Sequence, residues 1–236
     1  MAKKNIGAHP AVSPIPAFMV SCADKEGNSD IITISYGGIV SANPPMVYIS
    51  VRDTRYSYPM LKEVNDFVIN IPSEDQAKET DYCGITTGRK VDKWKLCNFT
   101  EEKGEFVKSP MIKECPVNME CVTRHVIHLG SHDIFLAEVV ATHADESVLN
   151  DKDKVMIDKV KPFAFCYNIQ EYWSLKELIG HYGWSKPELD KDLDMLSVNI
   201  RAVHILTKKI GQKLYKQGFG SLLNVGSCAG LMPAGP

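Results

Sequence analysis

Hydroxyl groups, small residues and arginines gather in one short region of the sequence, residues 33–57. Segment 33–45 reads Thr-Ile-Ser-Tyr-Gly-Gly-Ile-Val-Ser-Ala-Asn-Pro-Pro, and segment 50–57 reads Ser-Val-Arg-Asp-Thr-Arg-Tyr-Ser. Small residues let backbone N–H groups come close to a ligand, and hydroxyl groups can donate to phosphate oxygens. The planar guanidinium fork also matches phosphate geometry. The pattern therefore indicates a site for a phosphate-bearing ligand, with an ordinary turn and two solvent-facing arginines as the alternative.

Three histidines, His125, His128 and His132, resemble a metal-binding trio. Positions 125 and 128 are an odd step apart on a predicted strand, so their side chains point to opposite faces, and we predict no metal site. Cys115 and Cys121 are interpreted as small packing residues. No Ser-His-acid order and no pair of carboxylates stands out, so the sequence assigns no catalytic residue.

Composition excludes several classes of partner. Among 236 residues, 44% are hydrophobic and 24% charged, and the formal net charge is −2. Lysines and arginines are spread along the chain, so we expect no binding to nucleic acid. No apolar run approaches the ~20 residues that cross a bilayer, so we expect no membrane association. Seven cysteines without a CxxC pair fit reduced thiols and predict a cytoplasmic protein.

The candidate residues lie on and between predicted β-strands. Apolar and β-branched runs predict strands at 17–22, 31–35, 46–51, 67–71, 117–129, 134–142 and 162–167. The first two form a hairpin around the polar turn at 24–28. A short helix is expected at 58–65, Ser73 is a helix N-cap, and 80–100 is loop-like. Many short strands with few helices predict a mainly β barrel or sandwich.

The pattern changes near residues 184–187. Apolar residues recur at helical spacing from 189 to 214, and 221–225 is a short apolar run typical of a buried strand. We therefore expect two domains, at 1–185 and 186–236, with an α/β fragment as the second.

The order of these features resembles the flavin reductase-like, FMN-binding split-barrel family. Residues 16–72 contain the hairpin, the Thr/Ser-rich segment ending in Pro-Pro, the strand followed by arginines and hydroxyls, and a Phe-Val-Ile-Asn-Ile strand, in the family's order. The strings Gly-Arg-Lys-Val-Asp-Lys-Trp at 88–94 and Gly-Ser-His-Asp-Ile-Phe-Leu-Ala-Glu-Val at 130–139 resemble its flavoredoxin branch. The similarity covers roughly residues 10–180 and implies a split β-barrel with a few short helices.

The resemblance implies FMN as the cofactor and gives candidate residues their roles. The flavin ring and ribityl chain would lie along Thr33, Ser35 and Tyr36, in the same hydroxyl-rich segment as Ser41. The phosphate would lie near Ser50, Arg52, Arg55 and Ser57. Lys93, His132 and Phe165 would approach the flavin from later segments. A cation such as Lys93 or protonated His132 would favour the reduced, anionic flavin. The alternatives are a solvated loop lysine and a turn histidine that binds its own backbone.

Residues 192–236 resemble an interior piece of a short-chain dehydrogenase. By that likeness, Asn199 and Ser227 match the active-site Asn and Ser of that family. By the same likeness, there is no room upstream of residue 192 for the Gly-rich nucleotide loop of that fold, and the sequence ends before the place where its Tyr-x-x-x-Lys pair should follow. We therefore expect a truncated remnant and no second active site.

The family resemblance implies flavin-dependent oxidoreduction in a homodimer. Bound FMN would take a hydride from NADH or NADPH and pass electrons to free flavin or another acceptor. One alternative is a flavoredoxin that carries electrons between redox proteins without a nicotinamide site of its own. A second alternative is a passive flavin-binding or sensor module.

Overall fold

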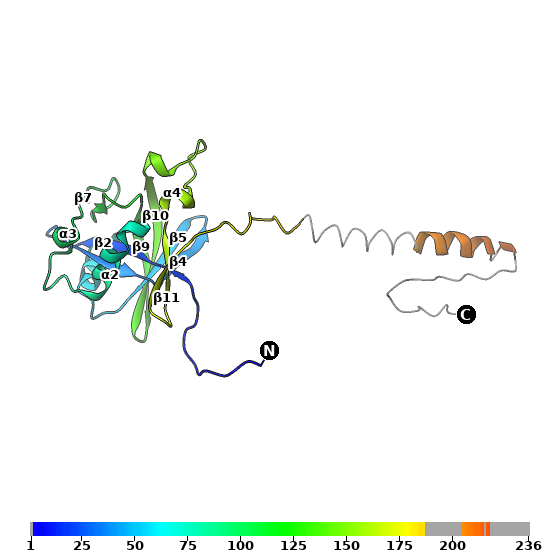
Figure 1. Ribbon diagram of the computed structural model, residues 1–236, viewed down its shortest axis with the longest axis horizontal. Coiled ribbons are helices and arrows are strands. Elements are labelled where there is room, and N and C mark those ends of the chain that lie inside the picture. Colours follow the sequence, from blue (N-terminus) through cyan, green and yellow to red (C-terminus); the bar gives the residue numbers. More distant parts are fainter. Residues whose placement is uncertain (1, 187–203, 215, 218–236) are drawn as a thin grey trace. The chain divides into compact units, whose positions relative to one another are not determined.

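A seven-stranded antiparallel sheet dominates the first of two units in the computed structural model (Figure 1). The structure describes residues 2–186, 204–214, 216 and 217, and the two units are residues 1–176 and 177–236. In spatial order the strands are β3 (Ser29–Ile34), β2 (Phe18–Ala23), β6 (Asp66–Ile71), β9 (Val117–Leu129), β10 (His132–Ala144), β5 (Pro45–Val51) and β4 (Gly37–Ala42). The prediction of a mainly β fold is confirmed.

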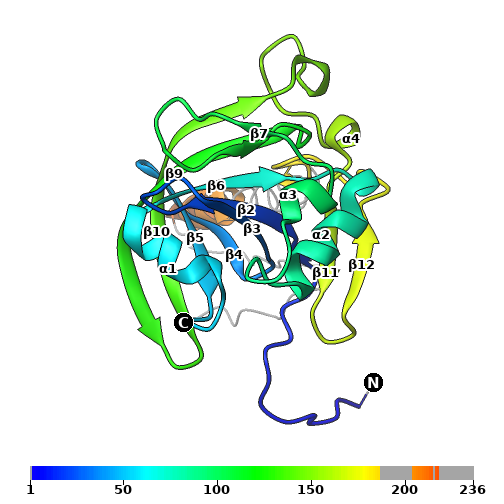
Figure 2. The same cartoon turned by 90° about the vertical axis from the view of Figure 1, so that its left-hand side faces the viewer.

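Smaller elements surround this sheet (Figure 2). A second sheet has the order β1 (Ile15–Pro16), β11 (Phe163–Cys166), β12 (Glu171–Ser174), and a third pairs β7 (Glu101–Glu102) with β8 (Met111–Ile112). The helices of the first unit are α1 (Ser57–Val64), α2 (Ala77–Ile85), α3 (Lys93–Leu96) and α4 (Ile157–Val160), with single 3-10 turns at Glu74–Gln76 and Glu146–Val148.

The order of the strands explains how the sheet closes. Strands β3 and β4 lie at its two edges, yet only Ser35 and Tyr36 separate them in the sequence. The sheet must therefore curl until its edges approach each other, as in a barrel. The backbone N–H of Ser50, on β5, donates to the Tyr36 carbonyl at 2.8 Å and extends the β4–β5 pairing by one residue towards this seam between β3 and β4. Irregular register between β9 and β10, at Leu136/Ala137 and Val139/Ala141, adds the bulges that help a sheet to bend.

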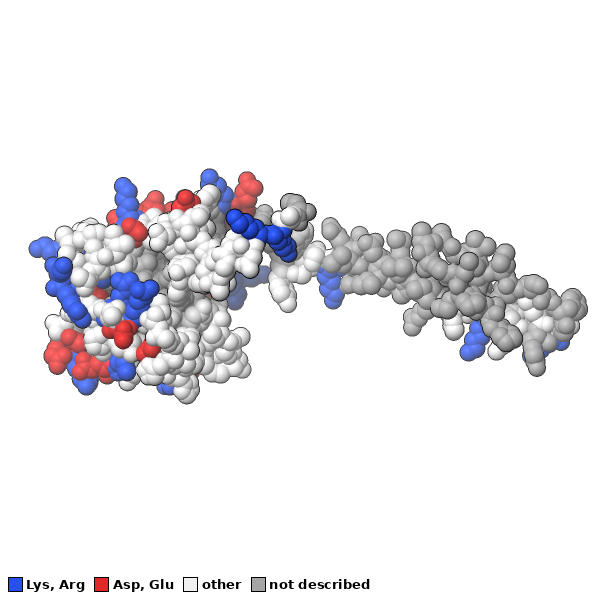
Figure 3. Space-filling model, turned by 90° about the horizontal axis from the view of Figure 1, so that it is seen from below, with Lys and Arg blue, Asp and Glu red and all other residues white. Residues whose placement is uncertain are grey.

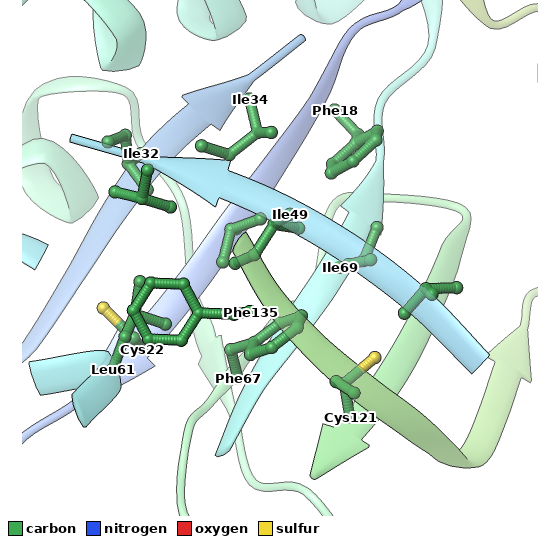
Figure 4. Packing of buried hydrophobic residues seen from close by; sticks show 14 of the residues in the cluster. Phe18, Cys22, Ile32, Ile34, Ile49, Leu61, Phe67, Ile69, Cys121 and Phe135 are labelled. Carbon is green, nitrogen blue, oxygen red and sulfur yellow. The ribbon is translucent and has the colours of Figure 1, made fainter. Parts of the chain in front are cut away.

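Apolar side chains from six strands and one helix fill the interior of the barrel (Figure 4). Phe67 on β6 and Phe135 on β10 are fully buried and lie beside Leu61 of α1. Along β5 every second residue is buried, as the period-two pattern predicts. Burial of each such side chain contributes about 1.5–3 kcal/mol, so this core holds the strand ends that carry the candidate residues.

Two sequence expectations for local structure are wrong. Residues 37–42, expected as part of a ligand-facing loop, form strand β4 because the outer edge of β5 offers unpaired backbone groups, and Ser41 pairs there with Met46. The loop expected at 80–100 contains most of α2 and all of α3. The side chain of Asp92 starts α3 by accepting from the Lys95 N–H at 3.1 Å, a local N-cap signal that the sequence contained.

The second unit is described only in part. Residues 204–214 are helical, within the amphipathic helix predicted at 189–214, whereas the predicted strand at 221–225, Asn199 and Ser227 lie outside the described residues. The division between Lys176 and Glu177 precedes the predicted boundary at 185. No described helix has the length and apolar character to span a bilayer. Figure 3 shows acidic and basic side chains interspersed on the face in view.

Candidate functional site

A cavity of about 240 Å³ opens at the seam of the barrel. It is formed by the end of β3, the end of β5, the start of β10 and the segment around β11. Its lining residues are Ile32, Thr33, Ile34, Ser35, Tyr36, Ser50, Val51, Arg52, Arg55, His132, Phe165, Tyr167 and Gln170. The cavity thus combines apolar, aromatic, hydroxyl and guanidinium groups on one surface.

Most of the candidate residues meet in this cavity. They are Thr33, Ser35, Tyr36, Ser50, Arg52, Arg55, His132 and Phe165. The region 33–57 supplies six of them because the end of β3 and the end of β5 approach each other across the seam. The hydroxyl of Thr33 is already engaged, since it donates to the carbonyl oxygen of Thr80 on α2. Thr33 therefore joins the cavity wall to a helix behind it.

Three candidate residues lie outside the cavity. Ser41 is on the edge strand β4. Ser57 is buried at the start of α1, and its hydroxyl donates to Asp30 Oδ2 at 2.8 Å. Lys93 is also buried, and its Nζ lies 3.3 Å from Asp30 Oδ1. The buried carboxylate of Asp30 thus attracts both polar groups, because an isolated charge in the interior is costly. The burial of Lys93 contradicts the alternative of a solvated loop lysine.

Two polar lining residues were not identified in the sequence. Tyr167 follows β11, and its ring centroid lies 5.5 Å from that of Tyr36, while Gln170 comes from the turn before β12. The available signal was the predicted strand at 162–167, because a period of two puts residue 167 on the same face as Phe165. The sequence pattern did not indicate that β11 pairs with β1, because the two strands are about 150 residues apart in the sequence.

Positive charge in the cavity resides on two arginines. Arg52 and Arg55 are exposed, and no carboxylate of the described residues forms an ion pair with either guanidinium. Arg52 Nε donates to His132 Nε2 at 3.3 Å, and Ser131 Oγ lies 2.8 Å from His132 Nδ1. Together these contacts assign an imidazole that accepts at Nε2 and donates at Nδ1, which is a neutral form.

The electrostatics agree with a neutral His132. Burial, followed by the nearby charges of Arg52 and Arg55, lowers the pKa of His132 below its ordinary value of 6.5. In the flavin-free protein at neutral pH, His132 therefore does not supply the cation that the family resemblance implied. The same partial burial, together with the neighbouring Tyr167 hydroxyl, raises the pKa of Tyr36 to about 12, so its phenol stays protonated.

This assignment gives a direct prediction for His132. In the flavin-free protein, the His132 ring should titrate below pH 6.5, and Arg52→Gln should raise its pKa because a positive neighbour is removed. Ring resonances followed by NMR against pH measure both values. Arg124→Gln on β9, which breaks an ion pair with Glu138 outside the cavity, is the control and should leave the pKa unchanged. A wild-type pKa at or above 6.5 would contradict the assignment.

The chain matches a known family over most of this unit. The model of the flavin reductase like domain matches residues 13–162. The chain belongs to this family. Among solved structures, it is similar to flavoredoxin of Desulfovibrio vulgaris (Miyazaki F), with 32% identity, a TM-score of 0.72, and coverage of 76% of this chain and 97% of that one.

Two further relatives extend the comparison. Flavoredoxin from Methanosarcina acetivorans is 30% identical with a TM-score of 0.72, over 77% of this chain and 95% of that one. A protein of Archaeoglobus fulgidus described only as uncharacterized is 26% identical over 133 residues, which are 56% of this chain and 74% of the relative. The predicted flavin reductase-like split-barrel fold is thus confirmed, and the protein is a flavin-related oxidoreductase or electron carrier.

The cavity residues fit a flavin nucleotide. The Tyr36 ring lies 5.4 Å from the His132 ring and 5.5 Å from the Tyr167 ring, so three aromatic groups bound one side of the space. A planar aromatic ligand can pack against such rings. The unpaired guanidinium groups of Arg52 and Arg55 suit a terminal phosphate. A family member needs both features, because its cofactor has a flat ring at one end and an anionic group at the other.

Proposed function

We propose that this protein is an FMN-dependent oxidoreductase that accepts a hydride from NADH or NADPH and passes electrons to free flavin or another acceptor. The observation that carries the proposal is the pair of unpaired arginines, Arg52 and Arg55, beside an aromatic-walled cavity in a flavin reductase-like barrel. When bound, the flavin supplies the hydride and electron-transfer chemistry. The protein has to bind it, orient it and set the charge around it.

The cavity residues divide these tasks. Arg52 and Arg55 hold the phosphate through charge-assisted hydrogen bonds. Phe165 and Tyr167 exclude water from one side of the cavity, and the protonated phenol of Tyr36 offers a hydrogen-bond donor. His132 stays neutral and is oriented by Ser131, so it can accept or donate without adding charge. The guanidinium groups are the permanent cations that favour an anionic reduced cofactor.

A carrier function is the second candidate, and one specific observation favours it. Two solved structures named flavoredoxin match at 30–32% identity over 95–97% of their own lengths. As a carrier, the protein would exchange electrons with redox proteins and react slowly with NADH and NADPH.

An anaerobic visible spectrum of the purified protein distinguishes these functions. The protein is loaded with FMN, and NADH and then NADPH are added before dithionite. Rapid bleaching of the flavin band by one nucleotide supports the reductase and identifies the donor. A band that bleaches only with dithionite supports the carrier. A band that resists dithionite supports a passive binding or sensor module, and failure to bind FMN contradicts the proposal itself.

We also propose a cytoplasmic homodimer. The edge strand β4 exposes Ile39 and Val40, with 83% and 52% of their surfaces accessible, and an exposed apolar edge suits a self-association surface. The six described cysteines are all free thiols, which is compatible with a reducing compartment. Light scattering after size exclusion should give twice the 26.3 kDa chain mass, and Ile39→Asp should shift it to that of one chain.

A further inference from the structure

Two cysteine thiols that are 14 residues apart in the sequence meet beside helices α2 and α3. Cys83 lies on α2, Cys97 directly follows α3, and their Sγ atoms are 3.8 Å apart. Helices α2 and α3 both pack against β3. A disulfide has an S–S length of about 2.05 Å, so the two sulfurs have to approach by less than 2 Å. A rotation of flexible side chains covers a gap of that size.

The two thiols differ in their access to solvent. Cys83 is fully buried in an apolar cluster with Met19, Trp94 and Ile112, whereas Cys97 is only partly buried against the same cluster. A reagent from solution can reach Cys97 but not Cys83. This difference in access makes Cys97 the sulfur that a reagent would oxidise first and Cys83 the sulfur placed to resolve it. Cys115 belongs to the same cluster but is 1% exposed, and no described contact joins it to another sulfur.

We propose that Cys83 and Cys97 form a reversible dithiol–disulfide couple that a hydroperoxide oxidises. In the first step, the Cys97 sulfur attacks the peroxide, an S–O bond forms, the O–O bond breaks and an alcohol or water leaves. In the second step, the Cys83 sulfur attacks Cys97, the S–S bond forms, the S–O bond breaks and water leaves. Two thiols and one hydroperoxide thus give one disulfide, one alcohol and one water. A small dithiol returns the pair to thiols by exchange.

The bond would connect two elements that support the flavin cavity. The hydroxyl of Thr33, which lines the cavity, donates to the carbonyl oxygen of Thr80 on α2. Gly84 of the same helix packs closely against the Thr33 side chain. The segment between the two cysteines includes α3, whose first residue, Lys93, forms an ion pair with Asp30. Oxidation therefore links the two ends of the segment 83–97 covalently. This consequence does not depend on whether the flavin function proposed above is correct.

Peptide mapping of the native full chain tests the proposal. The protein is treated with hydrogen peroxide at pH 8.5, blocked with N-ethylmaleimide and digested with trypsin. Burial raises the pKa of both thiols, so few are ionised and the reaction is followed over hours. We expect residues 79–89 linked to residues 96–103, at least tenfold more abundant than any other cysteine pair. The link should disappear after dithiothreitol treatment.

Variants separate the two roles. Cys83→Ser should accumulate a sulfenic acid at Cys97 that dimedone traps, whereas Cys97→Ser should leave Cys83 unmodified. Cys115→Ser is the matched control within the same cluster and should keep the 83–97 link. Wild-type protein in which Cys97 is over-oxidised without a link, or in which either thiol joins a different cysteine, would overturn the proposal. The wild-type map decides even if a variant fails to fold.

Discussion

Replacing both cavity arginines, by Arg52→Gln together with Arg55→Gln, is expected to weaken FMN binding about 100-fold. A hydrogen bond to a charged group contributes about 1.5–3 kcal/mol, and exposed groups fall at the low end. Since about 1.4 kcal/mol corresponds to a factor of ten in Kd, each arginine accounts for roughly one factor of ten. Glutamine keeps hydrogen-bonding capacity but removes the charge, so the loss reports on the phosphate charge.

Comparison of FMN with riboflavin makes this experiment specific. Both ligands are titrated by flavin fluorescence into the wild type, the double variant and Arg124→Gln, an exposed arginine outside the cavity. The wild type should prefer FMN over riboflavin, and the double variant should lose about two orders of magnitude of that preference with little change for riboflavin. The control should keep the preference. Equal weakening of both ligands would show that the arginines do not contact the phosphate.

Removing the ammonium of Lys93, by Lys93→Met, is expected to lower the free energy of unfolding by about 3 kcal/mol or more. The side chains of Lys93 and Asp30 are 2% and 3% exposed and are 3.3 Å apart, so the variant leaves a buried carboxylate without its countercharge. Breaking one side of a buried pair costs about 3–5 kcal/mol. That is a large share of the about 5–15 kcal/mol by which ordinary domains are stable.

A double variant and a cofactor titration show whether the role of Lys93 is structural. Adding Asp30→Asn should recover most of the loss in urea denaturation, because no buried charge is left uncompensated. Lys95→Met, at an exposed position on the same helix, is the control and should be nearly neutral. FMN affinity should change little in the folded variant. A tenfold weaker FMN affinity at an unchanged free energy of unfolding would instead indicate that Lys93 contacts the cofactor, as the family resemblance implied.

The sequence determined the features that depend on neighbouring residues. The hairpin of β2 and β3 follows from two apolar runs around a polar turn, and its predicted strands agree with the structure to within about two residues. The phosphate-matching arginines were also readable, because Arg52 and Arg55 lie at the end of a strand within one short segment. These features were predictable because the spacing of apolar residues along a segment reflects the local geometry of the strand that it forms.

Tertiary structure decided which polar groups face the cavity. Ser57 and Ser50 are equally plausible in the sequence, but Asp30, 27 residues before Ser57, captures the Ser57 hydroxyl at 2.8 Å. Tyr167 enters the cavity because β11 pairs with β1. Cys83 and Cys97 meet because two short helices pack together. Each outcome depends on pairing between distant segments, where the cost of burying a charge or an apolar face selects the partner, and no local pattern records that choice.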